Sequence, residues 1–313
     1  MDIVKGPARP LSGAQWTIAS GGQRAVVVEV GGALRAYQAD GIDYLDGYGE
    51  DELPTGYAGQ VLAPWPNRIR DGRYSFGGRE FQLALTEPER HVALHGLVNY
   101  LPWRLESQTA DSVVVRCDLP AQSGYPWPLL LRAEWRIGPT GLHVTHQATN
   151  VGREECPFGF SVHPYLRLPG VAVDDLLLRV PARSHLLLDN RLLPIGVAKV
   201  AGGEYDFTEP RRIGPAAIDM AFGDLELDPA AEEASRVTLS SPDGTAAVSV
   251  WADATFGWWQ VFTGDTLPGE RYRRSVAIEP MTCPPDAFRT GRDVIVLEPG
   301  RTFQASWGIR PGR

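Results

Sequence analysis

The sequence has little cysteine, and this argues against several classes of protein. Its three cysteines, Cys117, Cys156 and Cys283, are an odd number, lie far apart and form no C-x-x-C pair. This pattern argues against a disulfide framework and against a structural zinc site. Unpaired thiols fit the cytoplasm best, which is the location that the sequence predicts.

A basic surplus and long apolar runs are missing as well. The net charge is −8, whereas a nucleic-acid-binding protein usually carries an excess of basic residues. No apolar run approaches the roughly 18 residues that a membrane span needs. The first residues, MDIVKGPARPLSG, contain no apolar segment typical of a secretory signal. We therefore expect no nucleic acid and no membrane as partner, and no secretory signal.

Helical periodicity is nearly absent, and short strands punctuated by turns take its place. Only residues 229–236 suggest a turn or two of helix. Hairpins are predicted at 24–38 with a turn at Gly31-Gly32, at 129–151 with a turn from Gly138 to Gly141, and at 236–253 with a turn at Asp243-Gly244. Further strands are predicted at 112–119, 274–280 and 301–310. Without β-α alternation or a linker, this predicts an all-β antiparallel sandwich or barrel in a single domain, residues 1–313.

Two strand-like stretches place titratable groups on a polar face. In SVHPYLRL (161–168), an extended chain directs Ser161, His163 and Tyr165 to the same side. In the strand that begins SVAIEP, Glu279 shares a face with Ser275 and Ala277. Each face is either solvated or the wall of a site, and neither stretch alone decides between these interpretations.

Three further stretches combine turn residues with unusual polar groups. Asn67 and Arg68 precede a turn signal, His95 ends an apolar stretch, and Asp219 lies between apolar residues. Taken singly, such residues are more often an exposed arginine, a structural histidine and a turn-capping aspartate than parts of a site.

Histidine spacing argues against a metal cofactor. His143 and His146 are three residues apart on a predicted strand, so their side chains face opposite ways. His91 and His95 are four apart in a segment without helical character, and no third ligand stands at a suitable spacing. We expect no metal and no other cofactor.

Taken together and in this order, these stretches resemble the aldose 1-epimerase (galactose mutarotase) family over roughly residues 20 to 310. The matching segments are NRIRDGRYSFGG (67–78), LHG (94–96), HPYLRL (163–168), DMAF (219–222), VFTGDT (261–266), AIEPMTCPPDAF (277–288) and LEPGRTFQASWGI (297–309). Each segment alone is a weak signal, and their common order is a strong one.

The resemblance implies a large antiparallel β-sandwich with a sugar cleft, and an enzyme that interconverts the α and β anomers of a free aldohexose. Glu279 matches the family's general base, and His163 matches its general acid. The substrate-binding positions are matched by Arg68, His95 and Asp219, with Asn67 and Tyr165 beside them. A tryptophan, Trp65, Trp258 or Trp259, would cover an apolar face of the sugar or pack in the core.

The sequence departs from the family pattern at Leu97, at Leu166-Arg167 and at Met281-Thr282. HGLVNYLPW (95–103) instead resembles a subgroup that includes a sulfoquinovose mutarotase. The expected substrate is a neutral hexose first and a 6-sulfo sugar second, with Arg70 or Arg167 as partners for the anion. A hexose 6-phosphate would need an arginine cluster, for which Arg70, Arg73 and Arg167 are the candidates.

Two other classes of function stay open on the sequence alone. A non-catalytic carbohydrate-binding sandwich would not need both His163 and Glu279. A glycoside hydrolase would need two carboxylates, for which Asp219 and Glu279 are the candidates.

Overall fold

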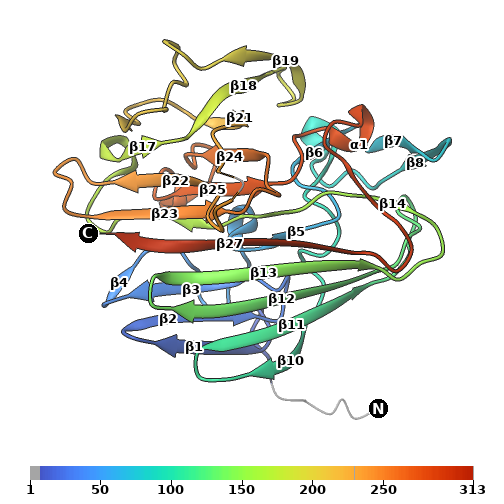
Figure 1. Ribbon diagram of the computed structural model, residues 1–313, viewed down its shortest axis with the longest axis horizontal. Helices are drawn as coiled ribbons and strands as arrows, with labels where there is room; N and C mark the ends of the chain where they lie inside the picture. The colour runs from blue at the N-terminus through green and yellow to red at the C-terminus, as the bar shows by residue number, and fades with distance from the viewer. Residues whose placement is uncertain (1–7, 229, 313) are drawn as a thin grey trace.

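The computed structural model describes residues 8–228 and 230–312, and nearly all of its regular structure is antiparallel β-sheet. A nine-stranded sheet and an eight-stranded sheet dominate the described chain (Figure 1). The predicted antiparallel β-sandwich is confirmed.

The strands fall into large and small sheets. The four-stranded sheet contains β1 (Gln15–Ser20), β2 (Gln23–Val28), β3 (Leu34–Ala39) and β4 (Ile42–Asp43). The nine-stranded sheet has the order β10 (Arg104–Gln108), β11 (Ser112–Leu119), β12 (Leu129–Gly138), β13 (Gly141–Asn150), β27 (Thr302–Gly312), β23 (Ala247–Ala252), β22 (Ser235–Ser240), β17 (Leu177–Arg179) and β20 (Arg211–Arg212). The eight-stranded sheet has the order β19 (Pro194–Lys199), β18 (Ala182–Leu188), β21 (Asp219–Leu225), β24 (Trp258–Phe262), β25 (Val276–Met281), β15 (Ser161–Val162) and β5 (Val61–Leu62), and β16 (Tyr165–Leu166) also pairs with β25.

The remaining elements are short. Two-stranded sheets join β14 (Cys156–Phe158) to β26 (Ile295–Leu297), β6 (Arg68–Arg70) to β9 (Val92–Leu94), and β7 (Arg73–Phe76) to β8 (Arg79–Gln82). The helical elements are α1 (Ala287–Thr290) and the 3₁₀ turns η1 (Thr55–Tyr57), η2 (Pro88–Arg90), η3 (Val173–Asp175) and η4 (Gly269–Arg271). No helix in the described ranges has the length and apolarity that a membrane crossing requires.

The hairpin of β12 and β13 shows why the predicted strands form. Buried and partly exposed side chains alternate along β12, because successive side chains of a strand face opposite sides of the sheet. At the turn, a Cβ on Gly141 would collide with the carbonyl oxygen of Ile309 on β27, so this position requires glycine. The predicted hairpins at 24–38, 129–151 and 236–253 are confirmed, as are the strands at 112–119, 274–280 and 301–310.

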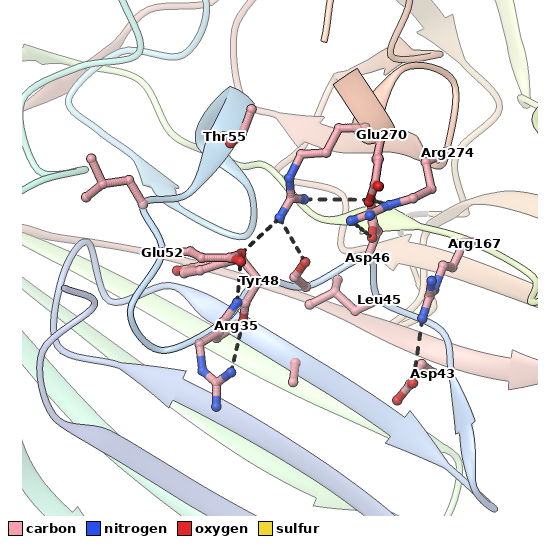
Figure 2. A pocket seen from close by; sticks show the side chains of 15 residues that line it. Arg35, Asp43, Leu45, Asp46, Tyr48, Glu52, Thr55, Arg167, Glu270 and Arg274 are labelled. Atoms are coloured by element: carbon pink, nitrogen blue, oxygen red, sulfur yellow. Dashed lines mark hydrogen bonds and ion pairs between the residues drawn. The ribbon is translucent and has the colours of Figure 1, made fainter. Parts of the chain in front are cut away.

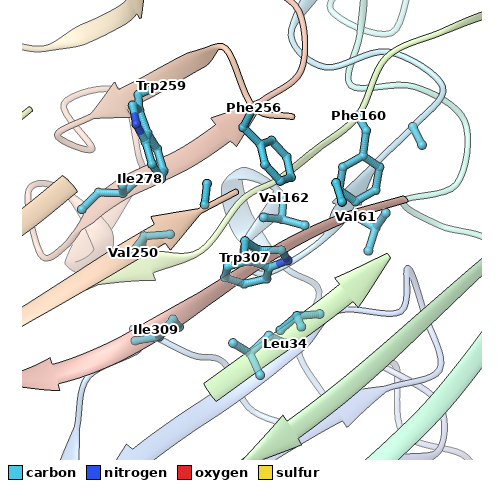
Figure 3. Close-up of a cluster of buried hydrophobic side chains, with 14 of the residues drawn as sticks. Leu34, Val61, Phe160, Val162, Val250, Phe256, Trp259, Ile278, Trp307 and Ile309 are labelled. Carbon is cyan, nitrogen blue, oxygen red and sulfur yellow. The ribbon is translucent and has the colours of Figure 1, made fainter. Parts of the chain in front are cut away.

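The main hydrophobic core lies between the two large sheets. Trp259 and Ile278 face it from the eight-stranded sheet, and Val250, Trp307 and Ile309 face it from the nine-stranded sheet (Figure 3). Each of these residues is at most 1% exposed. Burying a large apolar side chain stabilises a fold by roughly 1.5–3 kcal/mol. Because this core includes residues from Trp16 to Ile309, it supports the single domain predicted for residues 1–313, which stays a prediction.

Two local predictions are wrong. Residues 161–168 do not form a continuous strand, because His163 and Pro164 separate β15 from β16, two short strands that each pair with β25. Proline lacks the N–H that a sheet requires at this point. The helix suggested at 229–236 is also absent: residues 230–233 form turns and bends, and β22 begins at Ser235, while residue 229 lies outside the described residues.

Candidate active site

The seven predicted site residues line one cavity of about 200 Å³. They come from segments far apart in the chain: Asn67 and Arg68 at β6, His95 after β9, His163 and Tyr165 around β16, Asp219 at the start of β21, and Glu279 on β25. The sheets thus bring the predicted residues together, and their individual roles remain predictions.

Glu279 and His163 form the centre of this cavity. The Oε1 atom of Glu279 lies 3.2 Å from Nε2 of His163, and the two side chains are 2% and 6% exposed. The other carboxyl oxygen, Oε2, and the other ring nitrogen, Nδ1, have no hydrogen-bond partner in the structure. A buried carboxyl and imidazole within proton-transfer reach form a suitable acid–base pair.

Burial pushes the pKa values of this pair in opposite directions. It raises the pKa of Glu279 well above its ordinary value, with the charge of Asp219 adding to the effect and Arg68 opposing it. It lowers the pKa of His163 to about 3, although a backbone hydrogen bond of the residue opposes the shift. Both changes have one physical cause, because removal from water penalises the charged form of each group. Burial therefore favours the uncharged form of both groups, a carboxylic acid and a neutral imidazole.

Asn67 and His95 hold each other in place at the cavity wall. The N–H of Asn67 donates to Nδ1 of His95 at 3.2 Å, and the N–H of His95 donates to the carbonyl of Asn67. Since Nδ1 accepts, the ring proton of neutral His95 lies on Nε2, which is then a donor. Burial, together with His163 and Arg68, lowers the pKa of His95 well below its ordinary value and keeps the ring neutral.

Backbone strain gathers at the same wall. Asn67, His95 and Tyr57 all line the cavity and have φ angles of 54°, 60° and 61°. Such left-handed conformations cost non-glycine residues roughly 1–3 kcal/mol and often occur at functional sites.

Arg68 is fixed by Glu87, a cavity residue that the sequence did not single out. Its Nε and Nη2 atoms donate to the two oxygens of Glu87 at 2.7 and 3.1 Å. The two side chains are only 11% and 12% exposed, so water screens this bidentate pair weakly. Glu87 lies directly before the 3₁₀ turn η2, and no sequence motif marks it.

Asp219 is oriented by a second residue that sequence reasoning missed. Nε2 of Gln260 donates to Oδ1 of Asp219 at 2.6 Å. Burial raises the pKa of Asp219, while Arg68 and Gln260 oppose the increase. Gln260 stands opposite Glu279 in the β24–β25 register, so correct strand pairing was the signal needed to find it.

Tyrosines rather than tryptophans supply the aromatic walls. Tyr165 stacks on His163 with ring centroids 4.9 Å apart and donates its hydroxyl to the carbonyl of Gly56. Tyr57 meets His95 edge-on at 4.6 Å. Of the two alternatives left open for Trp65, Trp258 and Trp259, the structure supports packing in the interior, because all three are buried and none lines this cavity.

The predicted anion partners do not reach the cavity. Arg70 pairs with Asp189, Arg73 donates to Gln82, and Arg167 pairs with Asp43 at 3.6 Å. None of the three is among the residues that line the site. The arginine cluster considered for a phosphate is therefore not formed.

A larger cavity of about 800 Å³ contains Arg167 but none of the seven predicted residues (Figure 2). Its charged side chains largely pair with one another: Arg274 contacts Asp46 at 2.6 Å, and Arg271 lies 3.8 Å from the same carboxylate. Size alone does not make it the reactive site, because it lacks the carboxyl–imidazole pair.

Histidine geometry agrees with the strand alternation inferred from the sequence. On β13, His143 is partly exposed beside Glu232, whereas His146 is buried in the core. Across the described residues, no three His, Cys, Asp or Glu side chains gather in a way that would hold a metal ion. Metal independence stays a prediction.

A family model described as aldose 1-epimerase matches residues 14–310 of this chain. The chain is 31% identical to the uncharacterized protein YihR of Escherichia coli, over 99% of this chain and 98% of that protein. It is 27% identical to human galactose mutarotase over 58% of this chain and 53% of that protein.

Solved structures share the fold over nearly the whole chain. An aldose epimerase homologue from C. elegans aligns with a TM-score of 0.85 at 17% identity, covering 96% of this chain and 99% of that one. A putative aldose 1-epimerase from E. coli K12 aligns with a TM-score of 0.81 at 21% identity, with the same coverage of both chains.

Proposed function

The chain belongs to the aldose 1-epimerase family, an isomerase family, and from this premise we propose that it interconverts the α and β anomers of a neutral free aldohexose through Glu279 and His163. The observation that carries the proposal is the buried carboxyl–imidazole pair with 3.2 Å between Oε1 and Nε2. General mutarotase activity is the family's property, whereas the sugar and the residue roles are our proposal.

The reaction needs two proton transfers and no net change in protons. Glu279 takes the proton of the C1 hydroxyl while His163 gives a proton to the ring oxygen, and the C1–O5 bond breaks to leave an open-chain aldehyde. After rotation about C1–C2, the C5 hydroxyl attacks the other carbonyl face. Glu279 then returns its proton to the carbonyl oxygen, and His163 recovers its proton from the C5 oxygen. Both groups are thereby reset.

One shared proton is enough for this cycle. Burial favours a protonated Glu279 and a neutral His163, since removal from water penalises both charges. Moving that proton across the 3.2 Å separation gives the carboxylate and imidazolium that act as base and acid. The positive charge of Arg68 favours the carboxylate in this exchange.

The remaining polar groups suit a neutral polyol. Arg68 and the Nε2 atom of His95 are donors, and Asp219 is an acceptor, so sugar hydroxyls find partners of both kinds. The cavity lining holds one arginine against three carboxyl groups, Glu87, Asp219 and Glu279. This balance disfavours a sulfonate or phosphate, which needs a local positive surplus. A cytoplasmic location is part of the proposal, supported by three free, buried cysteines.

The test is one-dimensional NMR exchange between anomers for glucose, galactose, glucose 6-phosphate and sulfoquinovose. We expect acceleration of a neutral hexose above the buffer rate. Acceleration of an anionic sugar alone would overturn the substrate assignment. An unchanged exchange rate for every sugar, with binding still detectable by saturation transfer, would instead indicate a carbohydrate-binding protein.

A further inference from the structure

Strand β6, which carries Arg68, has a strand neighbour on only one edge. It is three residues long and pairs with β9 in a two-stranded sheet. Its other edge faces the beginning of α1, which lies beside it in Figure 1. A strand this short needs a second constraint to hold its side chains in one direction.

Asp286 makes the two hydrogen bonds that a further strand would make at that edge. Its backbone N–H donates to the carbonyl of Arg68 at 2.7 Å, and its Oδ1 atom accepts the N–H of Arg70 at 2.9 Å. A parallel strand neighbour makes the same two contacts with residues two apart, using its own carbonyl where Asp286 uses a carboxylate.

The Asp286 side chain is buried at this edge of β6. It is 0% exposed, and its Oδ2 atom accepts from Nε of Arg289 at 2.7 Å. The backbone has a φ of 63°, a left-handed conformation that aspartate tolerates better than most residues. No side-chain bond from Asp286 caps the backbone of α1, so one carboxylate oxygen is available to β6 while the other accepts from Arg289.

The segment from Glu279 to Asp286 connects the central pair to the rest of the site. Within it, the Thr282 N–H donates to the carbonyl of Phe160, and the Phe160 N–H donates to Oγ1 of Thr282. Phe160 directly precedes β15, which leads to His163. One segment therefore links Glu279 to the chain before His163 and, through Asp286, to Arg68.

We propose that Asp286 is a positioning residue that holds Arg68 in register with Glu279, an inference that rests on the substrate-binding role proposed for Arg68. Glu87 fixes the guanidinium of Arg68. The backbone position of Arg68, from which the side chain extends, is set by the contacts of Asp286 with this edge of β6. Loss of the carboxylate leaves the Arg70 N–H without this acceptor and frees the strand to shift.

The test compares variants of the full chain by NMR anomer exchange at varied sugar concentration. Asp286→Gly removes the carboxylate while keeping the backbone N–H and easing the left-handed φ. We expect it to raise KM roughly tenfold or more, with a smaller change in kcat, because misplaced binding groups weaken productive substrate binding. Asp286→Asn keeps an Oδ1 acceptor and should leave KM within about threefold of wild type. Arg289→Gln, which removes only the outer ion pair, should not change KM.

An Arg68→Ala background separates positioning from general stability. If Asp286 acts through Arg68, then Asp286→Gly causes no further loss in Arg68→Ala protein. Should the glycine variant not fold, Asp286→Ser provides a milder change that is judged by the same comparison. Two results with an active wild type overturn this inference alone. One is an unchanged KM in the folded Asp286 variant, and the other is an equal loss of activity from the Asp286 substitution in the wild-type and Arg68→Ala backgrounds. A wild type that leaves every sugar at the buffer rate contradicts the proposed function and, with it, this inference.

Discussion

Glu279 and His163 illustrate how one environment creates two opposite chemical groups. Both side chains lose water in the same cavity, yet burial raises the pKa of the carboxyl and lowers that of the imidazole. In the proposed cycle, a proton moves between Glu279 and His163, and the pair as a whole takes up or releases none. The two residues are therefore interdependent, and removal of either is expected to stop the cycle.

We expect Glu279→Gln to lower kcat/KM by about 10²- to 10⁴-fold, the range that a general base contributes. The amide keeps the size of the side chain but has no basic oxygen. Polarimetry on freshly dissolved sugar measures the rate, and circular dichroism checks the fold. Glu298, an exposed glutamate that also precedes a proline, offers the matched control Glu298→Gln, which should keep full activity. Near-wild-type turnover in folded Glu279→Gln protein would disprove the assignment of the base.

The pH profile of kcat/KM should reflect the shifted pKa values of the free enzyme. Because the pKa of His163 is lowered to about 3, the pair does not gain a second proton as pH falls from 7 to 5. We expect no decrease in kcat/KM over that interval. Its basic limb belongs to the raised pKa of Glu279 and should disappear in Glu279→Gln. A decrease with a midpoint near 6.5 would show that His163 titrates as an ordinary exposed histidine.

At the level of elements, β13 carries a histidine that the proposed mechanism does not use. His146 is 2% exposed and lies against Trp135, Phe160 and Trp307, and neither ring nitrogen has a hydrogen-bond partner. Burial lowers its pKa to about 3. The unfolded chain therefore binds a proton at this residue between its ordinary pKa of 6.5 and 3, and the folded chain does not.

His146→Phe should make the protein less sensitive to acid. Stability is lost as pH falls below 6.5 at this site, because the unfolded state binds more protons there. The variant lacks this proton uptake. The difference in free energy of unfolding between variant and wild type should therefore shift in favour of the variant by about 2 kcal/mol between pH 7.5 and pH 5. Urea unfolding at the two pH values measures the difference, and His146→Leu gives a smaller apolar replacement. An equal effect of the substitution at both pH values would rule out this account.

The β12–β13 hairpin and the interrupted stretch at 161–168 show where strand prediction works. The hairpin follows from alternation over two ten-residue strands and a glycine turn, which are local properties of the chain. The interruption at His163 and Pro164 also has a local cause, but alternation alone did not reveal it. His163 reaches the cavity at the break between two short strands and not on a continuous strand face.

For the whole molecule, we expect activity without a metal ion. Proton transfer by Glu279 and His163 is sufficient for ring opening and closure, and the histidine spacings in the sequence argue against chelation. Dialysis against EDTA should leave the anomer exchange rate unchanged. A reproducible loss of rate that Zn²⁺ or Mn²⁺ restores would contradict this expectation.

The sequence by itself determined the β-rich character, most hairpins and the family, because alternation, turn residues and ordered motifs can be read along the chain. Tertiary structure alone decided which groups meet. In the folded chain, Arg68 pairs with Glu87, and Gln260 lies opposite Glu279. The candidate tryptophans Trp65, Trp258 and Trp259 are buried. The tertiary structure also set the directions of the pKa shifts. These properties depend on strand register and on loss of water in the assembled cavity, and that cavity exists only when segments more than a hundred residues apart, such as those of Asn67 and Glu279, have packed together.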